Sequence, residues 1–186
     1  MKLTFKDIVR AGHVTRWHAV RTARQQTIAE HSFMVTMFAR EIARKVYNED
    51  IDSETLLLLI NYSLDHDLPE LVTGDIATTM KVRIREVAAA NNIEDPIDLI
   101  EREIAPQIHQ LSEKIKNTPL KYIVKLADIM DAKIFIEEEG IGSEAKVVSQ
   151  RVSVMFDEKI HQAKTDFPDL NWDAARVILK DLINTG

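Results

Sequence analysis

Two carboxylates flank an imidazole in the segment Asp65-His66-Asp67. The segment follows the apolar run from Leu56 to Ile60, so the helix that carries it is expected to face the core. A buried charge is strongly unfavourable unless another group compensates it. A divalent metal ion would supply that compensation, because neutral imidazole and carboxylate both bind borderline and hard metals.

Such a metal needs further ligands from other helices, and ionisable residues interrupt the apolar faces of two of them. His31 lies near the apolar stripe of a helix expected over residues 28–47, and Asp128 lies within the stripe of a helix expected over 119–139. Taken singly, His31 also fits a hydrogen-bonded core histidine, and Asp128 also fits a carboxylate at the edge of a helix face. Together with the His-Asp pair they complete a set of two histidines and two aspartates.

This ordered set resembles the HD-domain phosphohydrolases, whose pattern of His, His-Asp and Asp is matched by His31, His66-Asp67 and Asp128. The likeness is closest to the 5′-deoxynucleotidase-like branch and spans roughly residues 5 to 165. The motifs that carry it are Arg16-Trp17, Glu30-His31-Ser32, His66-Asp67-x-x-Glu70, Thr73-Gly74-Asp75 and Leu126-Ala127-Asp128. Within that branch the run Arg16-Trp17-His18 is most similar to bacteriophage members, some of which are dATP triphosphohydrolases.

The resemblance implies a compact all-α HD-domain helical bundle, with residues 1–186 as a single domain. It implies a divalent cation (Co, Mn, Zn, Fe or Mg) held by His31, His66, Asp67 and Asp128, and hydrolysis of the O5′–Pα bond of 2′-deoxynucleotides. The favoured activity is a triphosphohydrolase acting on dATP. The alternatives are a 5′-deoxynucleotidase acting on monophosphates and a non-catalytic helical module that binds a nucleotide or a protein.

Two further carboxylates suit acid–base chemistry. Glu70 lies three residues after Asp67, where one more helical turn would let it orient or deprotonate the attacking water. Asp75 follows Gly74 and resembles the family's second acid, which protonates the leaving O5′. On local grounds Glu70 also fits a solvated carboxylate and Asp75 a turn residue. A pure binding site has no use for an acid and a base beside the metal, so their presence favours an enzyme.

Substrate-binding residues are expected in the loop before His31. Arg16 can clamp a phosphate through two hydrogen bonds, and His18 could reach a base. The resemblance implies that Trp17 packs against the sugar and disfavours a 2′-hydroxyl, and the alternative is a Trp folded onto the edge of the core. A triphosphate brings about two more negative charges than a monophosphate. The candidate cations for these charges are Arg21, Arg24, Lys81, Arg83 and Arg85.

Composition and charge exclude several other classes. Among the 186 residues, 5 Gly and 5 Pro are too few for the turns of a β sandwich or barrel, and the absence of Cys removes thiolate catalysis. The longest run without a charge, Thr55 to Leu64, is far shorter than the roughly 18–20 residues of a membrane span. No apolar stretch of signal-peptide length opens the sequence, which predicts a cytoplasmic protein without a membrane partner.

The charge balance disfavours nucleic acid as a partner, because 24 basic residues face 30 acidic ones and the net charge is −6. The predicted partner is therefore a small deoxynucleotide. Apolar residues in the last two helices exceed what a small bundle can bury, which predicts a homo-oligomer.

Helical periodicity runs through almost the whole chain, and no sustained alternation predicts a strand. The helix over 56–67 is expected to be central because it is apolar nearly all round, and Pro106 is expected to kink the helix that begins at Pro96. The expected helices cover residues 5–11, 28–47, 53–67, 80–91, 96–116, 119–139, a segment from the cap Ser143 through Ile160, and 171–183.

Overall fold

The computed structural model describes residues 2–184, and its regular elements are helices. Over that range no strand forms, and pairing between extended segments is limited to the bridges Thr15–Thr27 and Thr22–Gly140. The all-α prediction is therefore confirmed. The helices are α1 (Phe5–Ile8), the 3-10 helix η1 (Val9–Gly12), α2 (Ile28–Val46), α3 (Ser53–Asp65), α4 (Glu70–Thr73), α5 (Thr78–Ala90), α6 (Pro96–Ile104), α7 (Pro106–Ile115), α8 (Pro119–Glu139), α9 (Gly142–Asp166) and α10 (Asp173–Asn184).

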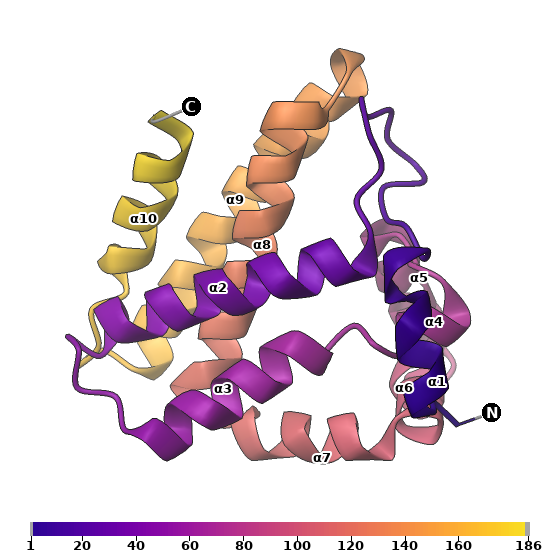
Figure 1. Ribbon diagram of the computed structural model, residues 1–186, viewed down its shortest axis with the longest axis horizontal. Coiled ribbons are helices and arrows are strands. Elements are labelled where there is room, and N and C mark those ends of the chain that lie inside the picture. The colour runs from indigo at the N-terminus through magenta and orange to yellow at the C-terminus, as the bar shows by residue number, and fades with distance from the viewer. Residues whose placement is uncertain (1, 185–186) are drawn as a thin grey trace.

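The centre of the molecule is the crossing of α2 and α8 (Figure 1). Both helices begin at strong caps. Thr27 and Glu30 bond reciprocally to each other's backbone N–H at the start of α2, and Thr118 precedes Pro119 at the start of α8. The inward faces of the two helices contribute Val35, Phe38, Ile42, Val46, Ile123, Leu126, Ala127 and Met130 to one core. Polar residues on these faces are consequently held in fixed positions.

The prediction that the 56–67 helix is central was wrong. In α3 the side chains of Leu57 and Leu64 are 58% and 47% exposed, and the buried residues are Leu59 and Ser63. The helix lies along one side of α2 and also packs on α7 (Figure 1). These neighbours and a smaller contact with α8 cover only part of the helix surface, so an apolar sequence can still leave a stripe in solvent.

Several helix boundaries also differ from the predictions: α3 ends at Asp65 and not at residue 67, α5 begins at Thr78 and not at residue 80, and α10 begins at Asp173 and not at residue 171. Pro106 separates two helices instead of kinking one, because the proline ring drives Ala105 out of the α region, to φ −137° and ψ 66°. α9 begins at Gly142, so Ser143 lies inside the helix and is not its cap. None of the helices within residues 2–184 has the length and hydropathy needed to cross a bilayer. The assignment of all 186 residues to one domain stays a prediction.

The loop between η1 and α2 is fastened at both ends. Near its base, the Arg16 N–H donates to the Gln26 carbonyl oxygen at 2.9 Å. Its far end meets the end of α8, where the Ala23 N–H donates to the Glu139 carbonyl oxygen at 2.7 Å. The run Arg16-Trp17 is thereby held beside the first turn of α2.

Candidate metal centre and active site

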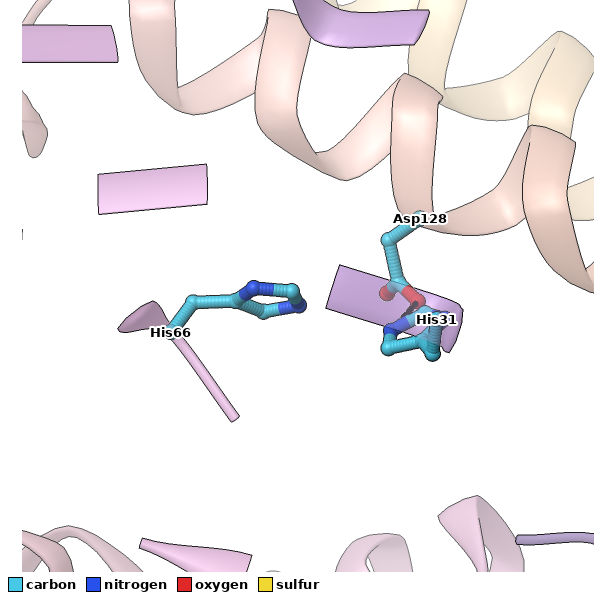
Figure 2. A group of neighbouring side chains, drawn as sticks. All are labelled: His31, His66 and Asp128. Carbon is cyan, nitrogen blue, oxygen red and sulfur yellow. Dashed lines mark ion pairs between the residues drawn. The ribbon is translucent and has the colours of Figure 1, made fainter. Parts of the chain in front are cut away.

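His31, His66 and Asp128 each bring one ligand atom to within 4.8 Å of the others. They come from the first turn of α2, the residue after α3 and the middle of α8, and Figure 2 shows His66 and Asp128 both directed toward His31. The Nε2 atom of His31 lies 3.6 Å from Oδ1 of Asp128. Three segments distant in sequence thus converge on one point at a spacing that suits a single ion.

Asp67, the fourth predicted ligand, lies beside this group. Its Oδ2 lies 3.2 Å from Nε2 of His31, and its Oδ1 lies 3.4 Å from Nε2 of His66. Both of these imidazole nitrogens are buried and lack a hydrogen-bond partner among the described residues. A buried polar atom without a partner is unfavourable, and a cation between these nitrogens and carboxylates would satisfy it.

Each histidine is oriented through its other ring nitrogen. Nδ1 of His31 lies 2.6 Å from Oδ2 of Asp131, and Nδ1 of His66 lies 2.7 Å from the carbonyl oxygen of Ser63. Donation from Nδ1 leaves the Nε2 lone pair available to a metal. Sequence reasoning missed Asp131, although its position one turn after Asp128 on α8 was a usable signal.

The two histidines differ in their affinity for a proton. Burial and Arg16 oppose a charge on His31, but the carboxylates of Asp131 and Asp67 outweigh them and raise the pKa of His31 to about 9. Burial dominates at His66 and lowers its pKa, although Asp67 acts in the opposite direction. In the metal-free protein a proton therefore occupies His31, and a cation has to displace it.

The two aspartates favour the ionised form. Burial raises the pKa of both groups, but His66, which is charged at the low pH where Asp67 titrates, and His31, which also bonds to it, hold the pKa of Asp67 well below its usual range. At Asp128 burial is likewise outweighed, chiefly by Lys125, and the pKa is lowered. The Lys125 Nζ donates to Asp128 Oδ2 at 2.6 Å. Both carboxylates are thus available as anionic ligands at neutral pH.

Arg16 lies against the ligand carboxylates. Its guanidinium nitrogens are 3.7 Å from Asp67 Oδ2 and 3.9 Å from Asp128 Oδ1, and its side chain is 14% exposed. One of these nitrogens, Nη1, is buried without a hydrogen-bond partner in the described chain. An unused N–H beside a cation site is suited to an anionic ligand such as a phosphate oxygen.

Glu70 opens α4 and is 4% exposed. Its Oε1 accepts a hydrogen bond from Lys81 Nζ at 2.7 Å, whereas its buried Oε2 has no partner in the residues described. Burial, together with the charge of Asp67, raises the pKa of Glu70 to about 8 against the opposing effect of Lys81. A carboxyl group with a pKa near neutrality is suited to proton transfer. Lys81, a predicted substrate contact, lies at the site as the ion-pair partner of this group.

Asp75 lies in the turn between α4 and α5. The preceding Gly74 has φ +76° and ψ 161°, a conformation that essentially only glycine adopts. Asp75 is half-buried, and its charge acts on both Arg16 and Glu70. The structure thus brings this predicted acid into the electrostatic environment of the metal ligands.

Trp17 and His18 lie at the margin of the site. The Trp17 ring stacks on Phe135, with ring centroids 5.6 Å apart and 14° between the planes, and its Nε1 donates to Gln26 Oε1 at 2.9 Å. His18 is exposed. Trp17 is therefore fixed by specific contacts, whereas the base-contacting role of His18 stays a prediction.

Several of the expected phosphate-binding cations are engaged elsewhere. Arg24 pairs with Glu30 at 2.8 Å and with Glu139 at 2.9 Å. Arg83 pairs with Glu86, and Arg85 pairs with Asp95. The structure thus brings Arg16 and Lys81 to the ligand cluster and places Arg24, Arg83 and Arg85 in surface ion pairs.

Comparison with known proteins identifies the family. Residues 4–167 match the model for the YfbR-like 5′-deoxynucleotidases. The chain is 30% identical to a dATP triphosphohydrolase of Acinetobacter phage SH-Ab 15497, over 98% of this chain and 92% of the relative. It is 28% identical to a 5′-deoxynucleotidase of Enterobacter sp. (strain 638), over 73% of this chain and 71% of the relative.

The fold matches that of a solved HD phosphohydrolase from cyanophage S-2L, a structure with bound dA and one catalytic Zn²⁺ ion. The match has a TM-score of 0.78 and 24% identity and covers 100% of both chains. The HD-domain bundle predicted from the motifs is therefore confirmed. On the family match and the phage relative, the chain belongs to the YfbR-like 5′-deoxynucleotidase family of HD phosphohydrolases.

Proposed function

We propose that the protein is a divalent-metal-dependent phosphohydrolase that cleaves the O5′–Pα bond of 2′-deoxynucleotides, with dATP as the preferred substrate. The observation that carries this proposal is the convergence of His31, His66 and Asp128, with buried imidazole nitrogens that lack a partner in the described chain. Asp67 is the proposed fourth ligand. Mixed nitrogen and oxygen donors suit Zn, Co, Mn, Fe or Mg, and the cyanophage neighbour holds Zn²⁺.

The bound cation would supply Lewis acidity toward water and the phosphoryl oxygens. Glu70 in its ionised form accepts the proton of the attacking water as the oxygen bonds to Pα, and its raised pKa makes that carboxylate a stronger base. Arg16 directs its unpaired N–H to a phosphate oxygen. As the O5′–Pα bond breaks, O5′ takes up a proton that Asp75 relays from solvent, and Glu70 then releases the proton taken from water, so that the products are the deoxynucleoside and the phosphate chain.

The phage relative named dATP triphosphohydrolase supports the triphosphate, because it matches nearly the whole chain. The 5′-deoxynucleotidase relatives support the alternative substrate, a deoxynucleoside monophosphate. The ion pairs of Arg24, Arg83 and Arg85 leave fewer free cations for a triphosphate than the sequence suggested. A non-catalytic binding module is disfavoured by the buried Glu70 beside the metal ligands.

We further propose a cytoplasmic homo-oligomer whose partner is the small-molecule substrate, not nucleic acid or a membrane. A chain without Cys forms no disulfide and so does not depend on an oxidising compartment, which supports a cytoplasmic location beside the pool of deoxynucleotides. Three valines are exposed, at 46% for Val147 and 58% for Val154 on α9 and 58% for Val177 on α10. Contact with a second copy of the chain would bury these apolar side chains, which supports the proposal of self-association.

The decisive experiment incubates the metal-loaded protein with dAMP, dADP, dATP and the other dNTPs and separates the phosphate products. Deoxyadenosine with intact triphosphate is the expected result. Turnover of dAMP with dATP untouched would make the protein a monophosphate 5′-deoxynucleotidase. No turnover of any deoxynucleotide with Zn²⁺, Co²⁺, Mn²⁺, Fe²⁺ or Mg²⁺ would contradict the proposal.

A further inference from the structure

A continuous chain of hydrogen bonds runs from His31 to Trp17. His31 Nδ1 lies 2.6 Å from Asp131 Oδ2, and the Gln26 Nε2 donates to the same oxygen at 2.9 Å. The Trp17 Nε1 donates to Gln26 Oε1 at 2.9 Å. An indole N–H can only donate and a carboxylate can only accept, so the residue between them must accept on one side and donate on the other. Gln26 meets that requirement, and its orientation is therefore fixed.

The middle of this chain is shielded from water. Gln26 is 3% exposed and Asp131 is 4% exposed, while His31 is fully buried. In such surroundings a donor or acceptor left without a partner is costly, so the three groups hold one another in a single arrangement. Water therefore cannot readily replace the bond between Gln26 and Asp131 or the bond between Asp131 and His31.

Trp17 is held in a backbone conformation that it would not adopt unaided. Its φ is +69°, in the left-handed region that disfavours residues other than glycine. The ring is clamped between the Gln26 amide and the face of Phe135. Phe135 lies one turn after Asp131 on α8, so both contacts of the indole lead back to the helix that carries the metal ligand Asp128.

We propose that Gln26 and Asp131 are positioning residues that fix the Trp17 indole relative to the metal ligand His31, and thereby set the discrimination between deoxyribose and ribose. The inference rests on the proposed function, in which His31 binds the metal, and on the role that the family resemblance implies for Trp17, which is to pack against the sugar. When Pα of a nucleotide lies at the metal, the covalent bonds between Pα and C2′ limit the distance of C2′ from that metal. The space for a 2′-hydroxyl then depends on the distance between indole and metal ligand, and the bonds through Gln26 and Asp131 set that distance.

The test is the variant Gln26→Met, which keeps the side-chain length but can neither accept nor donate these hydrogen bonds. The bond between Asp131 and His31 remains, so the Zn²⁺ affinity is expected to stay within about twofold of wild type. The ratio of kcat/KM for dATP to that for ATP is expected to fall by about tenfold, which corresponds to one hydrogen bond. Gln25→Met is the matched control, because the Gln25 side chain is exposed.

A second measurement does not depend on turnover. The chain contains 2 Trp, so incorporation of 5-fluorotryptophan gives one ¹⁹F signal from Trp17 and one from Trp172. Trp172 is fully buried in the core and serves as an internal reference for the fold. Gln26→Met should shift or broaden the Trp17 signal and leave that of Trp172 unchanged. If the Trp172 signal also moves, the shorter amide in Gln26→Asn, which cannot span both partners, replaces Gln26→Met in every measurement.

The double variant Gln26→Met/Trp17→Ala completes the test. If Gln26 acts through Trp17, its substitution adds no further loss of discrimination once the indole is gone. Additive losses, or a Gln26→Met protein with the wild-type ratio and an unmoved Trp17 signal, would overturn the inference. Wild-type protein that hydrolyses no deoxynucleotide would instead contradict the proposed function, and the ¹⁹F spectra would still decide whether Gln26 holds Trp17.

Discussion

The two sides of the candidate site are built differently. On one side His31 and Asp128 project from the inward faces of α2 and α8, the long helices that form much of the core. On the other side His66 and Asp67 lie in the short stretch that follows α3, and Glu70 is the first residue of α4. That stretch is held by local bonds such as Glu70 N–H to the Asp67 carbonyl oxygen at 3.0 Å. The helical side thus provides a rigid wall, whereas the turn side gathers ligands and the acid–base group within a few residues.

The largest effect is expected where the turn side supplies ligands. His66→Ala or Asp67→Ala should abolish metal binding and activity together, because each variant removes one of four ligands and leaves the remaining buried charges uncompensated. Metal content by elemental analysis and turnover of dATP are the measurements. An Asp67→Ala protein with full activity would contradict the assigned metal site.

Glu70→Ala should separate the two functions of the turn side. Turnover is expected to fall by roughly 10²–10⁴-fold, the usual contribution of a general acid or base, while the metal is retained. Glu138→Ala, which removes an exposed carboxylate from α8, is the control. A metal-free Glu70→Ala protein would show that Glu70 is a ligand and not the base.

The helical side was the more predictable one. Thr27 and Thr118-Pro119 marked the starts of α2 and α8, and the apolar periodicity placed His31 and Asp128 on inward faces. Caps and periodicity are local signals, so the sequence carries them in full. The motif predicts the ligands proposed on the turn side, but the burial of Glu70 and its pairing with Lys81 depend on how α5 folds back.

The errors in prediction share a physical cause. The apolar composition of α3 says nothing about how many neighbours cover it, so the exposure of Leu57 could not be foreseen. The role of Asp131 depends on the approach of α2 to α8, which pairs residues far apart in the chain. The neutralisation of Arg24 by Glu139 likewise needs the loop tip to reach the end of α8. Tertiary proximity, not local preference, decides each of these.

The pH dependence of stability compares His31 on the helical side with Glu70 on the turn side within one protein. The pKa of His31 is raised from 6.5 to about 9, and that of Glu70 from 4.5 to about 8. Both folded-state values are raised, so the stability that each proton contributes is complete below the unfolded-state pKa and is lost as the pH rises through the folded-state pKa. The contribution of Glu70 is therefore lost between about pH 4.5 and 8 and that of His31 between about pH 6.5 and 9, and the melting temperature of the metal-free protein should fall from about pH 6.5 to 9, with the two losses overlapping up to about pH 8.

Two controls assign this loss of stability. Glu70→Gln should remove the pH-dependent loss of stability that Glu70 causes and leave the loss that His31 causes. Zn²⁺ should flatten the profile, because a metal-bound imidazole does not carry the proton. A metal-free melting temperature that is constant or rises from pH 6.5 to 9 would contradict the assigned protonation of His31.

A smaller effect is expected at the margin of the site. Trp17→Ala should narrow the difference in kcat/KM between dATP and ATP by about tenfold, since the flat wall that disfavours a 2′-hydroxyl is removed. Parallel kinetics with the two nucleotides measure it. Unchanged discrimination would leave Trp17 as a packing residue on Phe135.

The smallest effect on metal binding is expected from Lys125, a partly exposed residue on the helical side. Lys125 donates to Asp128, but its side chain is 46% exposed, and an exposed ion pair contributes little because water screens it. His31 and Arg16 also face Asp128 and help keep it ionised, so Lys125→Met should change the Zn²⁺ dissociation constant by less than about threefold. Calorimetric titration at neutral pH measures this, with Lys121→Met, an exposed lysine of the same helix, as the control. A loss as large as that of a ligand variant would show that the rigid wall depends on this surface charge as well as on the core behind it.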